Sequence, residues 1–115
     1  MQYSELPIFK SIYDLTLEMY MLVRGFNKEF KYTLGEQLKK ETTELAILIY
    51  KANSKKDKRE ALENAREKLE TVRLLVRLAK DLKIISLRAF VRASKNIQDT
   101  SKQILGWQRS CIATV

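Results

Sequence analysis

Arginine and lysine recur at helical spacing in the last part of the chain, and cations in such an arrangement can do chemistry with anions. They lie three or four residues apart, which puts neighbours on one helix face, in two triplets: Arg73, Arg77 and Lys80, then Arg88, Arg92 and Lys95. Only Asp81 and Asp99 are acidic after residue 71, so this segment carries nearly all of the net charge of +8. Guanidinium groups bind phosphate oxygens in pairs, and a one-sided basic surface attracts polyanions. We therefore predict a basic face that contacts phosphates, with little readout of base sequence.

Other chemistry has few candidate residues. The sequence has no histidine, which removes the commonest general base and metal ligand. The carboxylate pairs Asp14/Glu18 and Glu41/Glu44 share helix faces, but lysines lie near them and we interpret both pairs as solvated surface. Cys111 lacks the histidine partner of a cysteine nucleophile. The sequence therefore predicts no catalytic residue, no metal site and no cofactor, and a protein that is not an enzyme.

Trp107 has two interpretations. It follows Gly106 near the end of the last predicted helix, where an indole can close the end of the core. The alternative is that it stacks on a nucleobase, although the sequence places no second aromatic residue near it. We favour the role in the core.

Four amphipathic helices would position these side chains. Apolar residues recur at steps of three and four, and only three glycines and one proline interrupt the chain. Pro7 suits the first turn of a helix, and Thr33 with Glu36 has the spacing of a capping box. The predicted helices cover residues about 7–25, 33–53, 57–83 and 86–109, and the tail 110–115 carries no strong signal.

The length and the short links define the predicted architecture. A chain of 115 residues fits a single domain. Short links between long helices favour antiparallel neighbours, so we predict an all-α protein, an up-down-up-down antiparallel four-helix bundle. Two sets of residues add more apolar area than a lone bundle hides, and we expect a homo-oligomer because such patches mark interfaces. These sets are Phe9, Tyr13, Leu17 and Tyr20 in the first helix and Leu74, Leu75 and Leu78 in the third.

The chain has no membrane signal. No stretch approaches the roughly 20 apolar residues of a membrane span, and the N-terminus MQYSELPIFK lacks the pattern of a signal peptide. The single cysteine cannot form an internal disulfide. We expect a cytoplasmic protein that does not bind membranes.

Several stretches of the sequence also resemble a known family over about residues 6–109. They are IYDLTLEMY, a Phe-Lys link, KYTLGEQLKKE, LLVRLAKDLKII and ILGW, in that order. Together they are similar to the accessory variability determinant (Avd) proteins of diversity-generating retroelements. A sister family, the four-helix-bundle proteins encoded in 23S ribosomal RNA intervening sequences, continues into Ile-Ala-Glu-Gly where this chain has IYKA at 49–52. That family shares Tyr32, Leu34, Gln37 and Leu38.

The resemblance implies a function. Avd-like proteins are four-helix bundles that assemble into ring-like homo-pentamers, bind nucleic acid and partner the reverse transcriptase of the retroelement. That enzyme copies a template RNA with adenine-directed errors, and the accessory protein is not itself a polymerase. Four residues match the basic region of the family: Arg73, Arg77, Lys80 and Lys83.

We therefore expect a non-catalytic accessory subunit that binds RNA, DNA or both and partners an error-prone reverse transcriptase. The alternative is a structural homo-oligomer of the intervening-sequence type whose basic face binds an acidic protein. The predicted nucleic-acid-binding residues are Arg73, Arg77, Lys80, Lys83, Arg88, Arg92 and Lys95.

Overall fold

The protein is described by a computed structural model, which covers residues 6–113 and contains helices and no strand within that range. The helices are α1 (Pro7–Arg24), α2 (Lys28–Lys31), α3 (Leu34–Ala52), α4 (Arg59–Asp81) and α5 (Leu87–Ala113). The all-α class predicted from the sequence is confirmed. Among these residues, no helix is long and apolar enough to cross a membrane.

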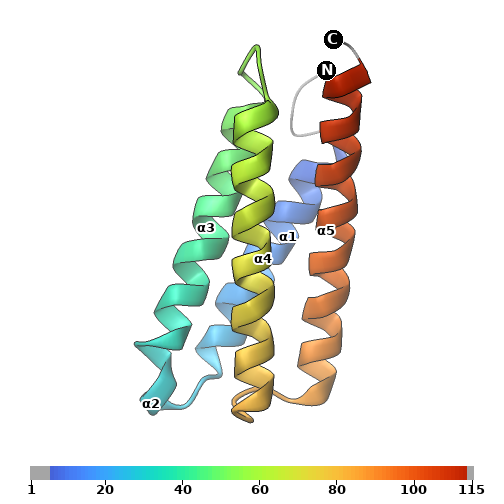
Figure 1. Ribbon diagram of the computed structural model, residues 1–115. Coiled ribbons are helices and arrows are strands. Elements are labelled where there is room, and N and C mark those ends of the chain that lie inside the picture. Colours follow the sequence, from blue (N-terminus) through green and yellow to red (C-terminus); the bar gives the residue numbers. More distant parts are fainter. Residues whose placement is uncertain (1–5, 114–115) are drawn as a thin grey trace.

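The four long helices form an antiparallel bundle with extents of 48 × 22 × 22 Å (Figure 1). Helix α1 packs against α3 and α5, and α4 packs against the same two helices. The helices therefore enclose one core, and the α1/α3 side lies opposite the α4/α5 side. This is the up-down-up-down order that the short links predict.

The start of α3 differs from the sequence prediction. A short helix, α2, occupies the link before it, and Thr33 makes no cap to the α3 backbone. Its hydroxyl instead donates to the carbonyl of Phe30 at 3.4 Å, so the predicted capping box with Glu36 does not form. Gly35 lies so close to α1 that an added Cβ would be 2.7 Å from Cγ1 of Val23. Glycine at this position therefore lets α1 and α3 approach each other.

The end of α5 also differs. We predicted a tail from residue 110, whereas the helix continues to Ala113. The reason is that Cys111 packs against the core, seven residues after buried Ile104 and fourteen after buried Ile97. The apolar face thus extends to the last described turn. Residues 114–115 of the predicted tail lie outside the described part of the chain.

Of the two apolar sets that we predicted to form an interface, some members are exposed and others are buried. Phe9 and Leu75 are buried, so these two belong to the core rather than to an interface. The remaining members of the two sets are exposed on α1 and α4: Tyr13, Leu17, Tyr20, Leu74 and Leu78.

Candidate nucleic-acid interface

The turn between α4 and α5 brings the two predicted triplets together. The N–H of Ile84 donates to the carbonyl of Ala79 and the N–H of Lys83 to that of Lys80, both at 2.9 Å. This is the bonding pattern of a Schellman motif, with Lys83 in the left-handed position at φ 61°. Ser86 then caps α5 by accepting a hydrogen bond from the N–H of Ala89 at 3.1 Å. The chain therefore reverses without glycine or proline.

The α4 triplet lies along the border with α5. Arg73 donates to the side-chain oxygen of Gln98 at 3.5 Å, and Nζ of Lys80 lies 4.7 Å from the centre of the Phe90 ring. These two contacts show the antiparallel register of the helices. Arg77 lies between them along α4, and its side chain is 73% exposed.

The α5 triplet lies on the outer face of that helix. Arg88, Arg92 and Lys95 are all exposed. Other residues of α5 make the contacts with the neighbouring helices: Asn96 and Gln103 bond to α1, and Gln98 and Gln108 bond to α4. Because Lys80 sits against Phe90 and Arg73 against Gln98, the two triplets lie at similar heights along the bundle. Lys83, the seventh predicted residue, is exposed at the turn.

A longer regularity underlies the triplets, and the sequence analysis missed it. Cations recur every seven residues, which is about two helical turns or about 10 Å. On α4 they form what we name the α4 row: Arg59, Arg66, Arg73 and Lys80. On α5 they form the α5 row: Arg88, Lys95, Lys102 and Arg109, all exposed. The seven-residue step was the available signal, but near-balanced charge before residue 72 concealed half of the α4 row.

The two rows differ in their acidic neighbours. Each member of the α4 row has a carboxylate within 4 Å: Arg59–Asp57 at 2.9 Å, Arg66–Glu63 at 2.9 Å, Arg73–Glu70 at 3.3 Å and Lys80–Asp81 at 3.7 Å. Arg77 also lies 3.8 Å from Asp81. Within residues 6–113, no carboxylate forms an ion pair with any member of the α5 row, with Arg92 or with Lys83.

Two of the acids beside the α4 row, Asp57 and Glu63, have lowered pKa values. Hydrogen bonds from Arg59 lower the pKa of Asp57 to about 2. Hydrogen bonds from Arg66, and then from Gln108 across the helix border, lower the pKa of Glu63. The same contacts raise the pKa of Arg59 and of Arg66. The Asp57–Arg59 and Glu63–Arg66 pairs therefore remain charged at neutral pH and offset part of the positive potential of the α4 row.

The carboxylate pairs considered as catalytic candidates have other partners. Lys68 bonds both Glu41 and Glu44, at 2.9 and 2.7 Å, and so ties α4 to α3. Asp14 pairs with Lys10 at 2.9 Å, and Glu18 accepts a hydrogen bond from Asn96. Among the described residues, no group of three or more carboxylate or thiol side chains could hold a metal ion.

Comparison with known proteins bears on the resemblance drawn from the sequence. A search of curated proteins finds no match to this chain. The protein-family comparison does find one, and it agrees with the Avd-type pattern of the quoted stretches. A model of the bAvd-like family matches residues 6–111, most of the chain, and the protein therefore belongs to that family.

Proposed function

We propose that this protein is a non-catalytic accessory subunit that binds nucleic acid and partners an error-prone reverse transcriptase in a diversity-generating retroelement. Membership of the bAvd-like family supports the accessory role, and this is not a known enzyme family. The observation that carries nucleic-acid binding is the α5 row, four exposed cations without an acidic partner among the described residues.

The α5 row suits a long polyanion. Its four members span about 30 Å of helix, and a duplex presents one negative charge per about 1.7 Å along its axis. Arg92 and Lys83 add charge beside the row, whereas Arg73, Arg77 and Lys80 contribute less because Glu70 and Asp81 lie beside them. The contacts are to phosphates, so RNA and DNA are both ligands and sequence preference is weak.

The opposite side of the bundle supports self-association. Leu17 and Met21 of α1 are 50% and 58% exposed, and Tyr13 and Tyr20 of α1 and Ile47 of α3 are exposed beside them. A contiguous apolar surface of this kind is favourable to bury against a second copy. We propose a homo-oligomer, and the family resemblance makes five copies the expected number. The reverse transcriptase is the proposed protein partner.

Salt dependence tests the proposed function. Each neutralised phosphate contributes about 0.9 to the salt slope on duplex DNA, so four contacts lower the affinity about a hundredfold or more between 50 and 200 mM salt. Fluorescence anisotropy with mixed-sequence DNA and RNA duplexes measures this slope. Affinity that does not change with salt would refute phosphate binding and favour an acidic protein as the partner.

Two further measurements test the assembly. Light scattering should give a multiple of 13.5 kDa, and a stable monomer at micromolar concentration would contradict the oligomer. Co-purification with the reverse transcriptase of a diversity-generating retroelement tests the partnership, and its absence in the presence of nucleic acid would contradict it.

A further inference from the structure

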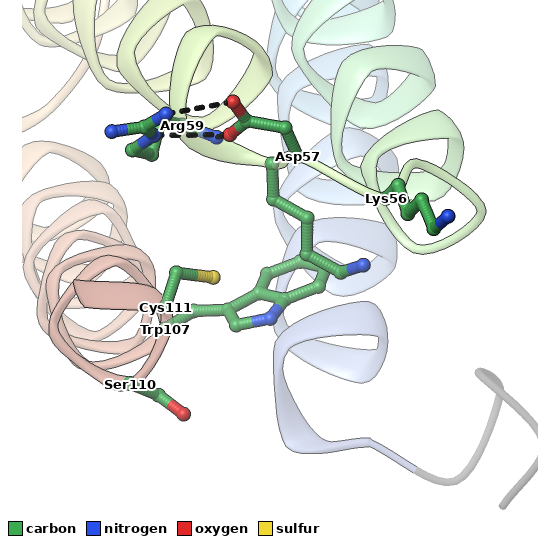
Figure 2. A pocket seen from close by; sticks show the side chains of 7 residues that line it. Lys56, Asp57, Arg59, Trp107, Ser110 and Cys111 are labelled. Atoms are coloured by element: carbon green, nitrogen blue, oxygen red, sulfur yellow. Dashed lines mark hydrogen bonds and ion pairs between the residues drawn. The ribbon is translucent and has the colours of Figure 1, made fainter. Parts of the chain in front are cut away.

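A pocket lies at the end of the bundle where the α3–α4 link faces the last turns of α5 (Figure 2). Its volume is about 540 Å³, which is within the range of sites that hold small molecules. Residues 56–59 line it from the link and the start of α4, and Trp107, Ser110 and Cys111 line it from α5. The pocket therefore forms only when the α3–α4 link and the last turns of α5 meet in the fold.

The wall made by the link is basic. Arg59 holds Asp57 through both carboxylate oxygens, at 3.1 and 2.9 Å, so the one acid in the wall already has its counter-ion. Lys58 donates to the carbonyl of Lys55, an uncharged group. Lys56 is exposed, and neither Lys56 nor Lys58 pairs with a carboxylate of the described residues. Two positive charges therefore remain available to an anion.

The facing wall is aromatic. Trp107 packs edge-on against Phe9, with ring centres 6.0 Å apart and planes at 74°. This contact fixes the indole from the core side, as the preferred interpretation of Trp107 predicts. Figure 2 shows the same indole lying across the pocket, between Cys111 and the link that carries Lys56. Trp107 thus contributes to the core and also presents ring surface to the pocket.

We propose that this pocket binds a nucleotide, whose base stacks on Trp107 and whose phosphate contacts Lys56 and Lys58. A nucleotide joins a flat aromatic base to a phosphate through a sugar, and so matches one aromatic and one basic wall; base stacking on an aromatic side chain adds about 1–3 kcal/mol. Arg109, the last member of the α5 row, lies two residues from Trp107. The nucleotide is either free or the unpaired end of a strand that follows the α5 row, and only the second source rests on the proposed function.

Trp107 is the only tryptophan in the chain, so its fluorescence reports on the pocket directly. We expect adenosine 5′-monophosphate to quench it with a saturable curve. Adenosine should bind at least tenfold more weakly, and inorganic phosphate should leave the emission unchanged. Equal quenching by adenosine and the nucleotide would overturn the role of the lysines. No saturable quenching below about 10 mM nucleotide would overturn the site.

Two variants separate the pocket from general charge. Lys56→Gln with Lys58→Gln should lower nucleotide affinity at least tenfold. The matched control, Lys28→Gln with Lys31→Gln, removes the same charge from α2 at the other end of the bundle (Figure 1) and should leave the affinity unchanged. Trp107→Phe keeps an aromatic ring against Phe9, and Trp107→Leu keeps only apolar volume. Equilibrium dialysis should show that the phenylalanine variant retains more affinity, and equal affinities would overturn stacking.

A third comparison distinguishes the two sources of the nucleotide. If the ligand is a strand end, a short single strand should bind at least tenfold more tightly than the mononucleotide. This gain should be lost in the variant Lys102→Gln with Arg109→Gln. Equal affinities identify a free nucleotide, and both results support the pocket. Duplex binding should persist in the Lys56/Lys58 variant. Failure of the pocket therefore leaves salt-dependent duplex binding intact, whereas failure of the proposed function removes it in the unmodified protein.

Discussion

The α4 row and the α5 row have the same seven-residue step and the same number of cations, but only the α4 row carries its own counter-ions. For the two middle members of the α4 row, the difference lies three residues before the cation. On α4 these positions hold Glu63 and Glu70, which pair with Arg66 and Arg73. On α5 the position three residues before Lys95 holds Arg92, and the position three residues before Arg109 holds Gly106. No such pair can form at either place.

The position three residues before Lys102 holds an acid, Asp99, yet the two side chains form no ion pair. Two rows with equal numbers of cations therefore offer unequal potentials to a polyanion. Regular spacing of positive charge shows where cations gather, and the ion pairs that each cation forms decide how much of that charge is available.

The largest expected effect comes from removing the α5 row. Changing Arg88, Lys95, Lys102 and Arg109 to Gln should lower duplex affinity at least a hundredfold at about 100 mM salt and reduce the salt slope by about three to four. The matched variant, with all four members of the α4 row changed to Gln, removes the same charge. It should lower the affinity less than about fivefold, because acids already offset those cations.

Circular dichroism and light scattering on both variants establish that helix content and oligomer size are unchanged. A larger loss from the α4 row than from the α5 row would reverse the comparison and place the interface on α4.

A smaller effect is expected from removing two of the acids that pair with the α4 row. Glu63→Gln with Glu70→Gln leaves Arg66 and Arg73 without counter-ions and should raise duplex affinity about three- to tenfold at low salt. Glu29→Gln with Glu60→Gln makes the same change in net charge, and neither of these acids forms an ion pair with a described residue. This control should gain less than about twofold. Equal gains in both variants would show that net charge matters and local pairing does not.

The smallest expected effect is that of pH. With no histidine in the chain and the pKa values of Asp57 and Glu63 lowered, duplex affinity should stay within about twofold between pH 8 and 5.5. The α4 pairs stabilise the folded chain above the unfolded pKa values of these acids, 3.8 for Asp57 and 4.5 for Glu63. That contribution to stability is lost as pH falls through the pKa values of the folded chain, the pKa of Asp57 in the folded chain being about 2.

Anisotropy measures the affinity, and circular dichroism followed against pH measures the stability. A marked change in affinity near pH 6.5, or a loss of helix above pH 5, would contradict the assignment of the charged pairs.

The sequence predicts the helices and their order because long segments repeat apolar residues every three or four positions. It does not predict features that depend on contacts between segments. The hydroxyl of Thr33 bonds back to Phe30 because α2 precedes α3. Lys83 takes a left-handed conformation that residue type does not suggest. The last turns of α5 form because Cys111 reaches the core.

Only part of the geometry of the candidate site is accessible from the sequence. Helical spacing identified both triplets, but a triplet is too short a window to show the rows. The ion pairs of Arg66 and Arg73 follow from spacing within α4 and were accessible to sequence analysis. The pocket at Trp107 was not, because its two walls lie about fifty residues apart in sequence.

The seven-residue step of the α5 row also has a geometric consequence. Two turns of an α-helix need slightly more than seven residues, so each cation points about 20° away from the preceding one around the helix axis. Between Arg88 and Arg109 the direction therefore turns by about 60°, and the row follows a shallow left-handed spiral over the surface of α5. A straight rod that touches all four side chains cannot lie parallel to the helix. It must cross α5 obliquely, at an angle determined by the periodicity of the helix itself.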